Sequence, residues 1–190
     1  MTLLQDWSLG PTFTGSGENF PLLRHVVTNE APPDSYALEF GVAEGTSLSI
    51  IAEHMPAVGF DSFLGLPEQW GPYPVGSRAC PPPAIINAQL VVGLFADTLP
   101  GFEFGDVEPI GLVHFDADLY SSTVTILDWV GPWLSDGCCL VFDEWHGNPW
   151  HKDHEEKAWR EYAHETGVAW EVIGHDREAW AIRIKEVPRG

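Results

Sequence analysis

Positive charge is scarce in this chain. Its 190 residues include 9 Lys and Arg against 28 Asp and Glu, so the formal net charge is -19 at pH 7. A field of that sign repels phosphate backbones and anionic lipid surfaces instead of attracting them. We therefore expect neither nucleic acid nor a membrane surface as a partner.

Long apolar runs are missing too. No segment reaches the roughly 18 apolar residues that a membrane span requires, and the N-terminal sequence MTLLQDWSLGPTFTG lacks the basic start and apolar stretch of a signal peptide. The three cysteines, Cys80, Cys138 and Cys139, have no zinc-type spacing, and adjacent residues of a strand point to opposite faces. These absences predict a cytoplasmic protein with reduced thiols.

Short apolar segments predict one α/β domain over residues 1–190. Five of them are apolar at nearly every position, which indicates strands buried on both faces of a parallel sheet: residues 36–42, 57–61, 88–95, 110–116 and 138–145. Helical patterns lie between several of these strands, at residues 46–55, 121–134 and 151–166. The last two segments, 168–176 and 177–186, alternate without an intervening helix and predict an antiparallel hairpin. We expect a Rossmann-like, mostly parallel sheet with helices on both faces.

A glycine-containing segment, LEFGVAEGTS at residues 38–47, follows the first strand. Gly41 and Gly45 would let a ligand approach the backbone closely, and the helix that begins at Thr46 and Ser47 offers free N–H groups. The spacing is not the GxGxxG of dinucleotide folds, and no Lys follows to hold a phosphate. The segment therefore favours a nucleoside without phosphate over NAD or ATP, with a plain structural turn as the alternative.

Acidic residues stand at the ends of the predicted strands, where open α/β sheets bind ligands. Asp61, next to Ser62, is placed to accept hydrogen bonds from both hydroxyls of a ribose, although an Asp that caps a turn explains it as well. Asp97 and Thr98 follow the third strand and are placed to face an adenine; an ordinary helix N-cap is the alternative for Asp97.

Two acidic pairs, Asp116 with Asp118 and Asp143 with Glu144, end the fourth and fifth strands. Four carboxylates at neighbouring strand ends would raise one another's pKa unless a cation compensated them. Oxygen ligands of this kind suit Mg²⁺, Mn²⁺ or Ca²⁺. The alternative is that one or two of them face solvent or pair with Lys152 or Arg160. The nearby histidines, His114 and His146, are more typical of structural or surface positions.

Five segments, LEFGVAEGTSLSIIA, GFDSFLGLPEQW, VVGLFADTLP, VHFDADLYSST and LVFDEW, together resemble the macrocin O-methyltransferase family of class I methyltransferases, which depend on S-adenosylmethionine (SAM). The resemblance implies a seven-stranded sheet and the Mg²⁺-dependent methylation of a hydroxyl on a sugar or another small natural product. It implies that Asp118 is the general base and that Asp116, Asp143 and Glu144 bind the metal. The SAM site would comprise Glu39, Gly41, Gly45, Thr46, Ser47, Asp61, Ser62, Asp97 and Asp116.

The chain departs from the family pattern at three places. It has DAD in place of the usual DGD, Asp143 and Glu144 in place of two aspartates, and a short N-terminal segment, residues 1–35, as its helical or lid portion. We expect the loop at residues 65–83, with Trp70, Tyr73 and Arg78, or a second subunit to close the site. The alternatives are a metal-independent methyltransferase with Asp118 or His146 as its base, a SAM-binding protein without catalysis and, least favoured, an NAD-dependent oxidoreductase.

Overall fold

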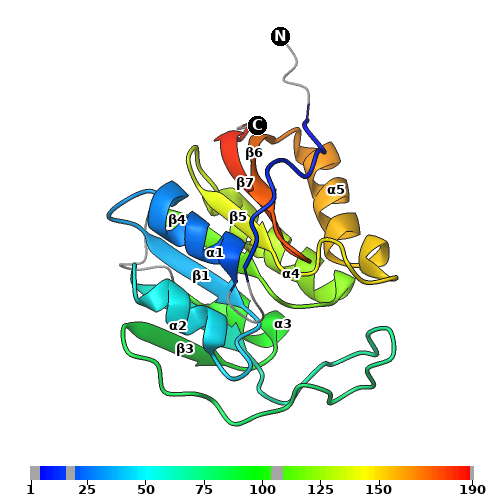
Figure 1. Cartoon of the computed structure of the whole chain (residues 1–190). Helices are drawn as coiled ribbons and strands as arrows, with labels where there is room; N and C mark the ends of the chain where they lie inside the picture. The colour runs from blue at the N-terminus through cyan, green and yellow to red at the C-terminus, as the bar shows by residue number, and fades with distance from the viewer. Residues whose placement is uncertain (1–4, 16–19, 104–108, 189–190) are drawn as a thin grey trace.

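The computed structural model describes residues 5–15, 20–103 and 109–188 of the chain. Within these ranges seven strands form one sheet in the order β3-β2-β1-β4-β5-β7-β6 (Figure 1). The strands are β1 (Tyr36–Phe40), β2 (Ala57–Asp61), β3 (Ala88–Val92), β4 (Ile110–Phe115), β5 (Cys139–Phe142), β6 (Ala169–His175) and β7 (Trp180–Glu186).

Strand direction agrees with the sequence pattern. β1 to β5 pair in parallel, while β7 is antiparallel to both β5 and β6. Every residue of β4 and β5 is buried, as the nearly continuous apolar runs predicted for strands covered on both faces. The expected parallel sheet and its closing hairpin are thus confirmed.

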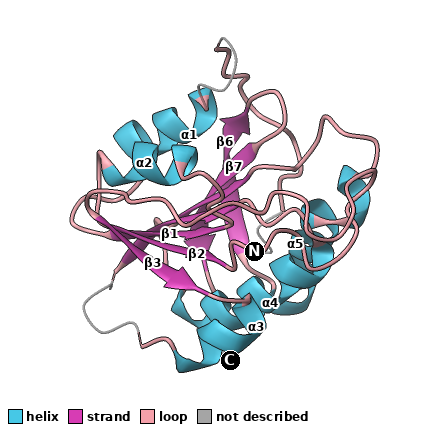
Figure 2. Ribbon diagram, turned by 90° about the horizontal axis from the view of Figure 1, so that it is seen from below, coloured by secondary structure: helices cyan, strands magenta, loops and turns pink. Residues whose placement is uncertain are grey.

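Helices cover both faces of the sheet, as Figure 2 shows, with α1 and α2 on one face and α3, α4 and α5 on the other. The helical segments are α1 (Pro21–His25), the π-helical turn η1 (Val26–Glu30), α2 (Thr46–Ala52), α3 (Phe95–Thr98), η2 (Leu99–Gly101), α4 (Tyr120–Val130), η3 (Gly131–Trp133), η4 (His151–Asp153) and α5 (Glu155–Thr166). Two apolar cores result. Phe115 and Trp159 belong to the core under α4 and α5, and Leu48 and Leu112 to the core under α1 and α2.

The structure shortens several predicted elements at Gly or Pro. β3 ends at Val92 because Gly93 follows with a φ of +151°, so the predicted strand at 88–95 becomes a shorter strand and then α3. The helix predicted at 121–134 gives way after Val130 to a 3₁₀ turn at Gly131–Trp133, which contains a proline. Gly and Pro at these positions therefore end β3 and α4 earlier than the apolar patterns predicted.

The N-terminal segment runs along the β6 side of the sheet (Figure 1, dark blue). The indole nitrogens of Trp170 and Trp180 donate hydrogen bonds to the carbonyl oxygens of Asp6 and Ser8, at 2.8 and 3.0 Å. Trp7 packs edge-on against Trp170, with 4.8 Å between the ring centroids. Of the predicted helical or lid portion, residues 1–4 and 16–19 lie outside the described residues, and Pro21–His25 is helical.

Two expected absences concern cysteine and the membrane. Cys80, Cys138 and Cys139 are free thiols, so the adjacent pair does not bridge. Across the described ranges, every helix is too short or too polar to span a lipid bilayer.

Candidate functional site

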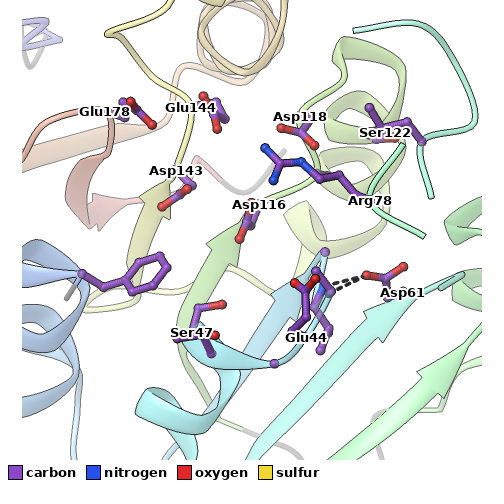
Figure 3. A pocket seen from close by; sticks show the side chains of 18 of the residues that line it. Glu44, Ser47, Asp61, Arg78, Asp116, Asp118, Ser122, Asp143, Glu144 and Glu178 are labelled. Carbon is purple, nitrogen blue, oxygen red and sulfur yellow. Dashed lines mark hydrogen bonds between the residues drawn. The ribbon is translucent and has the colours of Figure 1, made fainter. Parts of the chain in front are cut away.

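A cavity of about 940 Å³ opens at the carboxyl ends of the parallel strands. Segments that follow β1, β2, β3, β4 and β5 line it, and so do residues 12–15, Phe20 and Pro21 of the N-terminal segment. Its position is the one at which open α/β sheets bind ligands. Figure 3 shows how its polar side chains face the central space.

The glycine-containing turn after β1 forms one wall. Gly41 and Gly45 adopt left-handed φ values of +93° and +82°. A Cβ at Gly41 would lie 1.7 Å from the backbone oxygen of Asp116, so only glycine lets the ends of β1 and β4 approach this closely. Thr46 and Ser47, which also line the cavity, begin α2 directly after this turn. The segment is therefore both a structural turn and a cavity wall.

Asp61, at the end of β2, holds this turn in place. One of its carboxylate oxygens accepts hydrogen bonds from the amides of Val42 and Ala43, at 2.8 and 2.9 Å (Figure 3). The other oxygen accepts one from the amide of Phe63 at 2.7 Å. The turn-capping role that the sequence left open is thus present. Asp61 and Ser62 also line the cavity, so a contact with a ribose stays a prediction.

Asp97 and Glu39 lie outside the cavity lining, although both were predicted to bind a cofactor. Asp97 is exposed on α3, and Leu94, Phe95 and Ala96 provide the wall after β3 in its place. Sequence reasoning missed this apolar wall because a short apolar run after a strand looks like more strand. The predicted contacts of Asp97 and Glu39 with a cofactor stay predictions that the geometry does not favour.

Glu39 instead forms a fully buried pair beneath the cavity. Its carboxylate lies 2.8 Å from Nδ1 of His114, while Nε2 of His114 lies 3.7 Å from Asp143. Burial alone would lower the pKa of His114, but the flanking carboxylates of Asp143 and Glu39 outweigh it and raise that pKa well above its ordinary value. Burial raises the pKa of Glu39, and His114 opposes that shift. His114 is therefore a buried histidine placed between the carboxylates of Glu39 and Asp143.

Four carboxyl groups, which we call the acid cluster, line the cavity at the ends of β4 and β5: Asp116, Asp118, Asp143 and Glu144. Burial first, and then the charge of Asp143, raise the pKa of Asp116 well above its ordinary value. Burial raises the pKa of Asp118 to about 7, although Arg78 opposes the shift, and burial with the charge of Asp143 raises that of Glu144 to about 8. These shifts indicate carboxyl groups whose negative charge is incompletely compensated.

The structure does not support the predicted magnesium site. Across the ranges that the structure describes, no three His, Cys, Asp or Glu side chains are arranged to hold a metal ion. Asp143 lies close enough to Asp116 to raise its pKa, but Asp143 also faces His114, and Glu144 accepts a hydrogen bond from Asn148 at 2.9 Å. Metal binding by Asp116, Asp143 and Glu144 therefore stays a prediction.

A further buried acid, Glu155, packs behind the acid cluster at the start of α5. Its Oε2 accepts a hydrogen bond from the amide of Glu144 at 3.1 Å, while its Oε1 has no hydrogen-bond partner among the described residues. Burial, and then the charge of Glu144, raise its pKa well above the ordinary value. Stability attributable to this group therefore falls as the pH rises above the pKa of an unfolded Glu.

We predict that Glu155→Gln stabilises the fold at neutral pH. The gain has an upper limit of about 1.4 kcal/mol for each pH unit above the unfolded pKa, and it disappears near pH 4, where the unfolded chain also keeps the proton. Thermal unfolding at pH 4 and pH 7 measures the difference. Glu165→Gln, at an exposed site of the same helix, is the control. A wild-type melting temperature for Glu155→Gln at pH 7 would contradict the prediction.

The loop between β2 and β3, residues 62–87, forms the wall opposite the N-terminal segment. Its residues Gly65, Leu66, Pro67, Glu68 and Arg78 line the cavity, whereas Trp70 and Tyr73 do not. Trp70 is buried against Leu66 and Leu119, and Trp150 packs against the same cluster. The expectation that this loop supplies a wall thus agrees with the geometry for Arg78, while Trp70 anchors the loop.

Comparisons with known proteins agree with this architecture. Residues 38–145 match a family model described as a methyltransferase domain. No curated protein matches the chain. Among solved structures, the calicheamicin methyltransferase CalS11 has a TM-score of 0.65 at 23% identity over 85% of this chain and 75% of its own. The O-methyltransferase NovP has a TM-score of 0.60 at 20% identity over 86% and 76%.

A third solved structure, the O-methyltransferase TomG from Streptomyces achromogenes, has a TM-score of 0.56 at 17% identity and covers 87% of this chain and 78% of its own. At such identities these likenesses establish the fold, which is that of the Rossmann-like methyltransferases. The family model spans more than half of the chain. The chain therefore belongs to the methyltransferase domain family and is a methyltransferase enzyme.

Proposed function

We propose that this protein is a SAM-dependent O-methyltransferase that transfers a methyl group to a hydroxyl of a small molecule. The observation that carries the proposal is the position of Asp118. Its carboxylate lines the cavity across from the glycine-containing turn and accepts no hydrogen bond from any described residue. It is therefore free to take a proton from a bound hydroxyl.

The lining of the cavity supports SAM as the methyl donor. SAM carries a cationic sulfonium and no phosphate, which suits a turn without a phosphate-binding Lys and a cavity rich in carboxylates. Gly41, Gly45, Thr46 and Ser47 would lie along the methionine part and Asp61 with Ser62 near the ribose. TomG was solved in complex with SAM, which adds support from the same fold.

The reaction divides among the residues as follows. Bound SAM supplies an electrophilic methyl group on sulfur. Asp118 removes the proton of the acceptor hydroxyl, which turns a poor nucleophile into one that can attack the methyl carbon. The buried pair of Glu39 and His114 lies beneath Asp143, with 3.7 Å between Nε2 of His114 and Asp143, and the cavity walls would orient the acceptor hydroxyl toward the methyl group.

The names of two solved structures bear on the class of the acceptor. CalS11 is described as a TDP-rhamnose 3'-O-methyltransferase, and TomG as involved in tomaymycin synthesis. Together with the resemblance to the macrocin O-methyltransferase family, these names favour a hydroxyl of a sugar or another natural product. The net charge of -19 supports our inference that the partners are small molecules and not nucleic acid or membranes. We infer a cytoplasmic location from the three free thiols. We also infer that a second copy of the chain, in a homodimer, helps to close the acceptor side.

Calorimetric titration with S-adenosylhomocysteine (SAH), with EDTA present, tests the cofactor assignment. Binding is expected, and its absence would contradict the proposal. Binding without methyl transfer to any hydroxylated acceptor would instead identify a cofactor-binding protein that does not catalyse.

We predict that Asp61→Ala weakens SAH at least tenfold, because it removes both a ribose acceptor and the carboxylate that holds Val42 and Ala43. Asp97→Ala is the matched control, since Asp97 lies outside the cavity lining, and it should bind SAH like the wild type. The same titration measures both variants. Equal affinities for wild type and Asp61→Ala would remove Asp61 from the cofactor site.

A further inference from the structure

A cationic side chain reaches over the acid cluster from the loop between β2 and β3. Arg78 lines the cavity, and Figure 3 shows its guanidinium extended toward Asp118. Arg78 and Asp118 thus face the same central space of the cavity. The other cation of the described lining, Arg177, is 85% exposed and pairs with Glu178 at 3.0 Å. Arg78 is also an exposed residue and lies beyond ion-pair distance of the four acids, but it is the cation of the described lining that extends toward Asp118.

The loop that carries Arg78 is anchored at several points. Trp70 is 3% exposed, and its ring lies edge-on to that of Trp150 with 5.7 Å between the centroids. The hydroxyl of Ser121, in the first turn of α4, donates a hydrogen bond to Glu68. The ring of Tyr73 lies 5.3 Å from the guanidinium carbon of Arg78. Trp70 and Glu68 therefore anchor the loop ahead of Arg78, although residues 71–76 between them and Arg78 are exposed.

The backbone of Arg78 is strained. Its φ is +70°, a left-handed conformation that costs a residue with a side chain roughly 1–2 kcal/mol. Glycine would adopt this conformation without that cost. Because other residues with side chains, such as Asp34, share this conformation away from the cavity, the strain of Arg78 is useful chiefly as a test of its side chain.

The acid cluster needs a counter-charge, and its carboxylates are not arranged around a metal ion. We propose that Arg78 is the resident cation of the acid cluster, in the place that a divalent ion would take, and that it positions the acceptor oxygen beside Asp118. The second part rests on the proposed function. Arg78 supplies N–H donors that fit a hydroxyl or alkoxide oxygen held between it and Asp118.

A calorimetric titration of the full chain with Mn²⁺ alone tests whether Arg78 is the resident cation, and it needs no acceptor. We expect Arg78→Gln to bind Mn²⁺ at least tenfold more tightly than the wild type, because removal of one positive charge leaves the carboxylates free for the ion. Arg78→Lys should stay near the wild-type affinity. Lys185→Gln, which removes one positive charge from a distant and exposed site on β7, is the control for net charge. Equal Mn²⁺ affinities of wild type and Arg78→Gln would overturn the proposal.

Turnover tests the second part. With EDTA present, Arg78→Gln should lower kcat at least tenfold while the affinity for SAH stays unchanged, and Arg78→Lys should recover part of the loss. A wild type that binds no SAH would defeat the proposed function itself. If the wild type binds SAH and the wild type and Arg78→Gln methylate the acceptor at the same rate, Arg78 has no role in turnover, but the proposed function stands.

Arg78→Gly separates this role from a contribution to folding. It should unfold at the same or a higher denaturant concentration than the wild type, because it relieves the strained φ, and yet lose turnover like Arg78→Gln. Asp34→Gly, at a left-handed residue with a φ of +56° outside this cavity, should gain stability and keep full activity. A destabilised Arg78→Gly protein would show that the side chain serves the loop and would overturn the assignment.

Discussion

Asp118→Asn should lower kcat about 10²- to 10⁴-fold and leave the affinity for SAH nearly unchanged, because the amide keeps the shape of the carboxylate but cannot accept the proton. Asp118 adopts a left-handed φ of +61° directly after β4. Asn tolerates that conformation as readily as Asp does, so the substitution should not disturb the backbone. Single-turnover methyl transfer and SAH calorimetry measure the two effects separately.

The control and the pH dependence sharpen this prediction. Asp128→Asn removes an exposed carboxylate from α4, outside the cavity, and should have wild-type turnover. Because the pKa of Asp118 is raised to about 7 and the base acts as the carboxylate, wild-type kcat should rise as the pH increases through about 7. Full activity in Asp118→Asn, with this pH dependence retained, would exclude Asp118 as the base.

Strands and their order along the chain could be predicted from the sequence because the signal is local. Runs such as AVGFD at Ala57–Asp61 are apolar at successive positions, and that pattern is typical of a strand covered on both faces. The hairpin was readable for the same reason, since β6 and β7 follow each other without a helix. Element ends were less predictable, because they depend on the backbone at single residues such as Gly93.

The cavity could be located from the sequence, but the partners of its acids could not. Placing Asp61, Asp116 and Asp118 at strand ends required only the rule that such ends gather at one edge. The pairing of Glu39 with His114 depends on β1 lying next to β4 in a register that sets these two residues side by side. Nothing local to either segment specifies that register.

Glu144 illustrates the same limit for the predicted metal site. Its position directly after Asp143 fits a pair of metal ligands, but the direction of its side chain decides whether it can reach a metal ion. That direction follows from Asn148 and from the amide hydrogen bond to Glu155, which lie in the loop after β5 and at the start of α5. A loop conformation of this kind is set by tertiary packing, so the residue types alone cannot decide whether Glu144 binds a metal.

Gly41→Ala is expected to destabilise the fold by more than about 3 kcal/mol. Its left-handed φ of +93° alone costs a residue with a Cβ roughly 1–2 kcal/mol. The added methyl would also lie 1.7 Å from the backbone oxygen of Asp116, which belongs to a strand end and not to a flexible side chain. The overlap can be relieved only by moving the ends of β1 and β4 apart, and these ends carry the turn and the acid cluster. SAH affinity should therefore fall together with stability.

Gly137→Ala separates strain from overlap. Gly137 has nearly the same φ, +90°, but a Cβ there meets only Pro32 at 3.7 Å, which is ordinary contact. In chemical denaturation, the free energy of unfolding of Gly137→Ala should be about 1–2 kcal/mol lower than that of the wild type, and SAH binding should be normal. If the two variants lose equal stability, the close approach of β1 and β4 contributes nothing beyond the backbone conformation. If Gly41→Ala loses more, and loses SAH as well, the junction of these two strands is what aligns the methyl donor with Asp118.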